Sequence, residues 1–181
     1  MVFSLEPLEI KLDFERRKYR LGDTINAAVT LIPTRDVEIR KATVSLMGQV
    51  RRTEVRTGIP MSMDGSAKLQ GGNSFTTTDY IPMQQSTEQK ISTEVFDSAQ
   101  IVLNASLQRD VESSHNVALR LDPRARKLQN LAQEAKGLQR DANSSLSIEP
   151  WWLEVHADVA MGPDARVRRQ VEIVVPLKTS T

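Results

Sequence analysis

The stretch RKYRLGDTINAAVTLIP, residues 17–33, joins a short basic turn to a strand with a regular pattern. After the Leu-Gly-Asp of the turn, apolar residues from Ile25 to Leu31 occupy every second position, and Pro33 ends the run. A period of two is typical of a strand with one face in a core and the other in water. The stretch therefore predicts a half-buried strand and a fold built from β-sheets.

The same period of two recurs along much of the chain. Before this stretch, residues 8–14 alternate apolar and charged side chains behind Pro7, which marks the start of a strand or an edge strand. Residues 37–55 also alternate, but the apolar parity switches near Arg40–Lys41, which predicts a β-bulge. Further alternating segments predict strands at residues 90–103, 115–121, 151–159 and 167–175.

Two segments depart from this pattern. Asp122 can cap a helix and Pro123 suits its first position, so we expect one helix over residues 123–142. Its apolar stripe consists of Leu128, Leu131, Ala135 and Leu138. Residues 57–88 hold four of the eight glycines and many Ser, Thr and Gln, without sustained periodicity. This composition predicts a flexible polar loop or a loosely formed hairpin.

The number and spacing of these segments define the expected fold class. About seven strands with short turns favour an all-β, antiparallel, immunoglobulin-like β-sandwich with one inserted helix. The 181 residues are enough for a single domain with a sizeable core. We expect the helix to lie across one face or end, because a two-layer β fold has no interior place for it.

Three segments carry a resemblance to a known family. Residues 19–50 resemble the opening of arrestin-like domains, in which an aromatic and a Gly-acidic turn precede two alternating strands. The matching positions are Tyr19, Gly22, Asp23, Ile25, Val29, Ile39, Ala42, Val44, Leu46 and Gly48. Residues 106–123 look like the segment that leads into a strand ending in a proline, and residues 151–175 are similar to the closing pair of strands. The helix of residues 123–142 is an insertion that the usual domain lacks.

The resemblance carries functional expectations. Arrestins, retromer's related subunit and a bacterial sporulation-control protein of this fold class have two such domains, and only one fits in this chain. The resemblance implies a non-enzymatic adaptor or scaffold rather than an enzyme. It also favours a basic surface for phosphorylated peptides, because the N-terminal domains of arrestins present basic residues to phosphorylated tails.

The composition of the chain limits the cellular compartment and the classes of partner that we expect. The 24 basic and 23 acidic residues nearly cancel, so a nucleic-acid partner is not expected. The absence of cysteine excludes disulfides and thiolate metal sites. No apolar run has the length of a membrane span, and charged residues interrupt the N-terminal segment where a secretion signal needs an apolar core. We therefore expect a cytoplasmic protein.

Catalytic motifs are missing from the sequence. It contains no phosphate-binding glycine loop, no nucleophile elbow and no zinc-protease motif. Glu154, His156 and Asp158 share one face of a predicted strand and could in principle hold a divalent metal. Alternating polar residues on a solvated strand face explain them equally well. We predict no cofactor and no metal, and a metal-dependent enzyme is a distant third hypothesis.

Three basic clusters and one tryptophan are the candidate partner-binding residues: Arg16, Arg17, Lys18, Arg51, Arg52, Arg166, Arg168, Arg169 and Trp152. The clusters either form one patch for a phosphorylated peptide or acidic lipid, or are solvated strand ends. Trp152 lies on the same face of its predicted strand as the polar residues, so it is either an interface anchor or is covered by the predicted helix.

The first hypothesis for the function is an adaptor that binds another protein through sheet edges, loops or this basic surface. The alternative is a self-assembling homo-oligomer.

Overall fold

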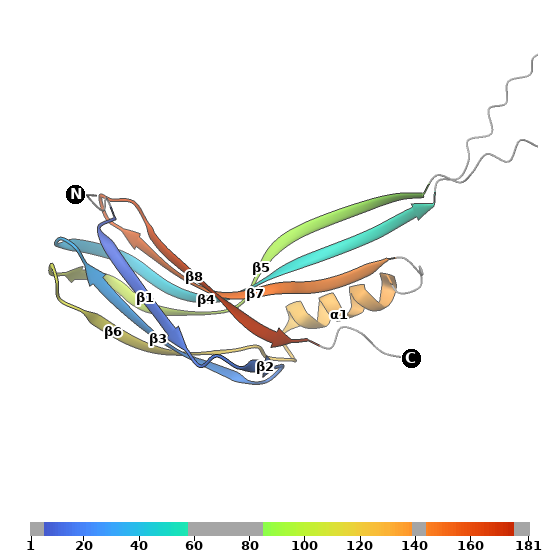
Figure 1. The fold of residues 1–181 in the computed structure, drawn as a ribbon, viewed down its shortest axis with the longest axis horizontal. Helices are drawn as coiled ribbons and strands as arrows, with labels where there is room; N and C mark the ends of the chain where they lie inside the picture. Colours follow the sequence, from blue (N-terminus) through green and yellow to red (C-terminus); the bar gives the residue numbers. More distant parts are fainter. Residues whose placement is uncertain (1–5, 58–84, 139–143, 176–181) are drawn as a thin grey trace, which may run out of the picture.

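The computed structural model describes residues 6–57, 85–138 and 144–175, which form two packed β-sheets and one helix (Figure 1). The smaller sheet is antiparallel and has the order β1 (Leu8–Phe14), β3 (Thr24–Pro33), β6 (Ser113–Arg120). The larger sheet has the order β2 (Lys18–Arg20), β8 (Ala165–Val174), β7 (Ser145–Val159), β4 (Val37–Thr57), β5 (Gln85–Leu107). Its β2–β8 pair is parallel and its other pairs are antiparallel. The predicted all-β sandwich with one helix is confirmed.

The stretch that predicted the fold becomes the central strand of the smaller sheet. β3 pairs with β1 on one side and with β6 on the other. Its Ile25, Val29 and Leu31 are buried, whereas the intervening Asn26 and Ala28 are exposed. The preceding basic turn differs from the prediction, because its residues 18–20 form β2, parallel to β8. Three residues are too short a run for alternation to reveal a strand.

β4 contains the predicted bulge. Its pairing with β7 changes register between Ile39 and Lys41, at the point where the apolar parity switches in the sequence. Before the bulge Ile39 is buried, and after it Ala42 and Val44 are buried. The extra residue therefore keeps apolar side chains on the core face on both sides of the bend.

The helix α1 (Arg126–Leu138) covers the part of the larger sheet that extends beyond the smaller one (Figure 1). Leu128, Leu131 and Ala135 are its buried residues, as the apolar stripe predicts. The helix begins later than expected, because the carbonyl of Ala125 accepts its first hydrogen bond and Asp122 closes the turn before it. Residues 139–142 of the predicted helix lie outside the described residues.

The predicted polar loop over residues 57–88 is tested only at its ends. Thr57 belongs to β4, and residues 85–88 belong to β5 and pair with it in register. Residues 58–84 lie outside the described residues. The one helix found in the described part of the chain is too short and too polar to cross a membrane.

Candidate partner-binding surface

The candidate site is built around β8, which has an incompletely paired edge. β8 pairs with β7 from Ala165 to Val171 and with β2 only from Glu172 to Val174. On the side away from β7, no described strand pairs with Ala165–Val171. β1 of the smaller sheet lies beside this side of β8 (Figure 1). An unpaired edge presents N–H and C=O groups that another strand can bind.

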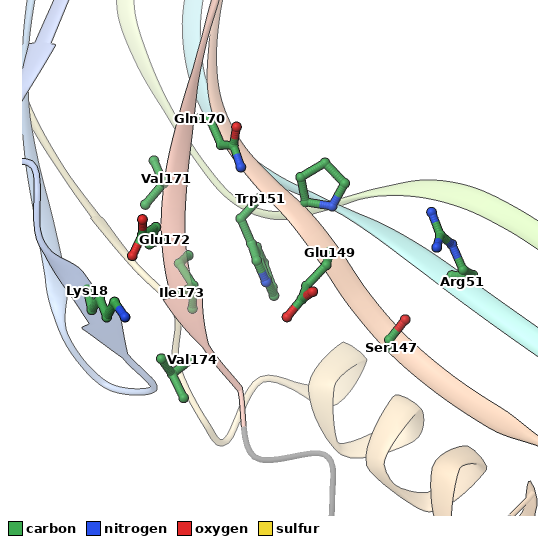
Figure 2. Close-up of a pocket in the computed structure, with 11 residues that line it drawn as sticks. Lys18, Arg51, Ser147, Glu149, Trp151, Gln170, Val171, Glu172, Ile173 and Val174 are labelled. Carbon is green, nitrogen blue, oxygen red and sulfur yellow. The ribbon is translucent and has the colours of Figure 1, made fainter.

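Three of the surface hollows along β8 share lining residues. Their volumes are about 460, 390 and 370 Å³, and Gln170 and Glu172 line all three. The two smaller hollows lie between β8 and the segment around Phe14 and Arg16. The largest lies between β7 and β8, with Trp151 on its wall (Figure 2). We call the three hollows together the β8 groove and the largest one the β7–β8 cleft.

Four of the predicted basic residues line the β8 groove and have no ion pair with any described residue: Arg16, Lys18, Arg51 and Arg169. Lys18 and Arg51 line the β7–β8 cleft, whereas Arg16 and Arg169 line a hollow nearer β1. Acidic side chains line the groove as well, namely Asp13, Glu149 and Glu172. The groove is therefore of mixed charge rather than one basic patch.

Arg17 stabilises the turn before β3. Its guanidinium lies 3.1 Å from carboxylate oxygens of both Glu15 and Asp23, and 4.2 Å from the centre of the Tyr19 ring. Asp23 also accepts a hydrogen bond from the backbone N–H of Arg20 at 3.0 Å. This backbone bond, together with the bond from Arg17, holds the pKa of Asp23 below its ordinary value. The contacts of Arg17 therefore stabilise this turn.

Arg52 connects β4 to the helix α1. Its guanidinium donates two hydrogen bonds to Glu134 of α1 and a third, of 3.1 Å, to the hydroxyl of Ser92. The bond to the Glu134 carboxylate raises the pKa of Arg52 above its ordinary value. Its neighbour Arg51 points to the other face of β4, as strand alternation requires.

Trp152, Arg166 and Arg168 lie on the outer face of the larger sheet. Arg168 pairs with Glu154 and places its guanidinium carbon 5.6 Å from the centre of the Trp152 ring. Arg166 lies 4.0 Å from Asp164, at the β7–β8 turn. The basic cluster of residues 166–169 is therefore divided between two faces, since Arg169 points into the β8 groove.

The prediction that the helix covers Trp152 is wrong. α1 binds Arg52, on the same face of β4 as Gly48, and that face packs against Trp151. Trp152 points to the opposite face because successive residues of a strand alternate. There it is half-buried, beside Arg168.

The three side chains considered as metal ligands, Glu154, His156 and Asp158, each interact with a different residue. Glu154 pairs with Arg168, and Asp158 lies 3.6 Å from Arg40. His156 Nε2 lies 3.0 Å from Asp164, and this hydrogen bond holds the pKa of Asp164 below its ordinary value. Across residues 6–57, 85–138 and 144–175, no group of three His, Asp or Glu side chains could hold a metal ion.

Sequence reasoning missed the residues that create the β7–β8 cleft. Glu149, Gln170 and Glu172 line it, and none of them stands out by type or charge. Pro150 was the available signal, because proline has no N–H for a strand ladder and interrupts pairing inside a strand. The pairing of β7 with β8 ends at Trp151, the residue after it.

Comparison with known proteins identifies the fold. No family model matches the chain, and no curated protein matches its sequence. Among solved structures it is similar to Spo0M, a sporulation control protein from Bacillus subtilis, at 11% identity and a TM-score of 0.53. The fold is arrestin-like. The match covers 94% of this chain but only 50% of the Spo0M chain, so this arrestin-like chain spans about half of that structure.

Proposed function

We propose that the chain is a single, non-enzymatic interaction domain that binds a partner protein at the β8 groove. The observation that carries this proposal is that β8 is incompletely paired on both sides, away from β7 along Ala165–Val171 and toward β7 after Val171, and that four cations without an ion pair among the described residues line the hollows beside it. An unpaired edge offers main-chain hydrogen bonds, and the charged side chains around it supply selectivity. The rigid strands hold both in place.

Two further observations support an adaptor over an enzyme. Neither histidine lines the groove: His156 bonds to Asp164, and His115 bonds to Ser113 at 2.8 Å. The similar structure, Spo0M, is named a sporulation control protein, which describes regulation rather than catalysis. The mixed charge of the groove favours a protein over an acidic lipid surface, because Asp13, Glu149 and Glu172 offset most of the attraction that its four cations would exert on anionic headgroups. Cytoplasmic location stays a prediction.

Self-assembly is the second candidate, and a different edge favours it. β5 is the last strand of the larger sheet and carries exposed Ile91, Val95 and Leu103. Exposed apolar residues on an edge strand favour pairing with another copy. Light scattering over a wide concentration range tests this candidate, because β5 pairing raises the molar mass with concentration.

Site-specific cross-linking tests the β8 groove. A photoreactive amino acid at Gln170 should link the chain to a discrete partner in cells, whereas the same group at Gln133 on the exposed side of α1 should not. Arg16→Glu with Arg169→Glu should then weaken binding of the purified partner by about 10-fold or more, because charge reversal adds repulsion at the site. Lys41→Glu with Lys136→Glu is the control with the same change in net charge. Equal affinities of both double variants would contradict the proposal.

A further inference from the structure

β7 and β8 diverge after the pair formed by Trp151 and Val171. The next residue of β7 is Pro150, which has no N–H to continue the ladder. From there the segment Ser147–Ile148 pairs with β4 only, and the segment Glu172–Val174 pairs with β2. Figure 2 shows the two strands separating with Trp151 between them. The β7–β8 cleft occupies this divergence, and no described strand lies between the two backbone edges that face it.

Trp151 places an unpaired hydrogen-bond donor at this cleft. The residue is only 2% exposed, and its indole Nε1, like that of Trp152 on the outer face, is buried without a hydrogen-bond partner among the described residues. A buried indole N–H normally has an acceptor, because it can only donate.

The orientation of the ring shows where an acceptor would have to come from. A Cβ at Gly48 of β4 would lie 3.0 Å from Cε3 of Trp151, and the Phe96 ring of β5 lies 4.6 Å from the indole. Nε1 belongs to the opposite edge of the indole, so it is turned away from β4. β8 lies on that side of β7, and so does the β7–β8 cleft.

The charges around the cleft indicate the class of ligand. Lys18, Arg51, Glu149 and Glu172 line it, and none of the four has an ion pair within the described parts of the chain. The two cations and the two carboxylates cancel, so the cleft offers no net attraction to a phosphate or another multiply charged anion. A peptide backbone is neutral and carries both carbonyl acceptors and N–H donors, which match the indole N–H and the facing strand edges.

We propose that the β7–β8 cleft binds an extended peptide segment of the partner protein. A carbonyl of that segment accepts the hydrogen bond of Trp151 Nε1, and its backbone lies along the edge of β8 that β7 leaves free. Because Nε1 is buried, the entering segment widens the divergence of the two strands. This inference rests on the proposed function, since it names the place in the β8 groove where the partner binds.

The test uses peptides selected from a library of random linear sequences for binding to the whole chain. The two tryptophans give two indole N–H signals in isotope-labelled protein, and Trp152→Phe assigns them. We expect a bound peptide to shift the Trp151 signal. Trp151→Phe, which keeps an aromatic ring but removes the donor, should weaken binding about 5- to 10-fold. Trp152→Phe is the matched control on the outer face and should leave the affinity unchanged.

A second variant keeps the test decisive if Trp151→Phe does not fold. Lys18→Glu changes an exposed side chain of the cleft and should also weaken peptide binding. Selected peptides that leave the Trp151 signal in place, or bind Lys18→Glu as well as the unchanged chain, overturn the inference. Displacement of peptide by inorganic phosphate at constant ionic strength overturns it in favour of an anion site.

The outcomes separate this inference from the proposed function. If Gln170 cross-links a partner that binds Trp151→Phe normally but binds the double variant Arg16→Glu with Arg169→Glu weakly, the β8 groove stands and the cleft does not. If no partner is cross-linked and no peptide is selected, both proposals fail.

Discussion

The larger sheet is covered in two different ways along its length. At one end the smaller sheet covers it, and apolar side chains such as Leu46, Leu153 and Val155 are completely buried between the sheets. At the other end α1 covers it with three buried side chains and two ion pairs to the sheet, Arg52–Glu134 and Lys127–Glu94. The burial of apolar side chains between the sheets therefore stabilises the first end, whereas the second end is held by a short helix and by partly exposed ion pairs. The second end should open more easily.

The largest expected effect is a loss of core volume at the sheet-covered end. Leu153→Ala removes a fully buried side chain of β7 and should lower the free energy of unfolding by about 3–4 kcal/mol. Leu131→Ala in α1 should cost less, about 2 kcal/mol, because the helix can shift to fill the space. Urea unfolding measures both. A larger loss for Leu131→Ala would contradict the comparison.

Gly48 lies where the two ends meet and tests the packing there. A Cβ at this position would lie 2.8 Å from Cγ2 of Ile148 and 3.0 Å from ring atoms of Phe96 and Trp151. Gly48→Ala should therefore destabilise the fold by about 1–3 kcal/mol. Gly137→Ala in α1 is the control, because nothing lies within 4 Å of its Cβ position. That control should stabilise the protein by about 0.5–1 kcal/mol, since alanine favours a helix over glycine.

Removing the Arg52–Glu134 pair should affect only the helix-covered end. Both side chains are partly exposed to solvent, so we expect Arg52→Met to cost about 0.5–1 kcal/mol. Amide hydrogen exchange should accelerate in α1 and remain unchanged in β3. Arg124→Met, which removes a cation just before the helix, serves as the control. Equal acceleration in α1 and β3 would show that the chain opens as one unit.

The smallest expected effect is the pH dependence of the turn at the sheet-covered end. Hydrogen bonding to His156 lowers the pKa of Asp164, so the ionised carboxylate is stabilised in the folded state. Its contribution is present above the ordinary pKa of about 3.9 and is lost as the pH falls through the lowered value. Asp164→Asn should therefore lower the melting temperature slightly at pH 5, and this difference should shrink as the pH falls below 4. A difference independent of pH would rule out this explanation.

Much of the fold could be predicted because a half-buried strand requires an alternating apolar pattern in the sequence. The alternation in β3 and the parity switch in β4 appear in the structure at the predicted positions. The apolar stripe of α1 also predicted which residues are buried. The face that the helix covers could not be predicted, because alternation gives two faces to a strand without saying which one a distant segment will meet.

The candidate site was harder to predict, because it depends on pairings between distant residues. Basic residues that are adjacent in sequence are separated by the fold, as Arg51 and Arg52 are by the two faces of β4. Lys18 and Arg51 meet in the β7–β8 cleft because β2 pairs with β8, which the sequence does not reveal. The charges in the sequence predicted which residues could bind a partner. Only the topology shows which of these residues have no ion pair among the described residues.

The two adjacent tryptophans have a practical consequence for spectroscopy. Trp151 is enclosed at the β7–β8 cleft, whereas Trp152 lies beside Arg168 on the outer face. They are the only tryptophans in the chain, so each single replacement leaves one fluorophore that reports one face of the same strand. With Trp152 replaced by phenylalanine, the emission spectrum and its quenching follow the cleft without any added label. β7 thereby carries a built-in optical reporter for each of its two surfaces.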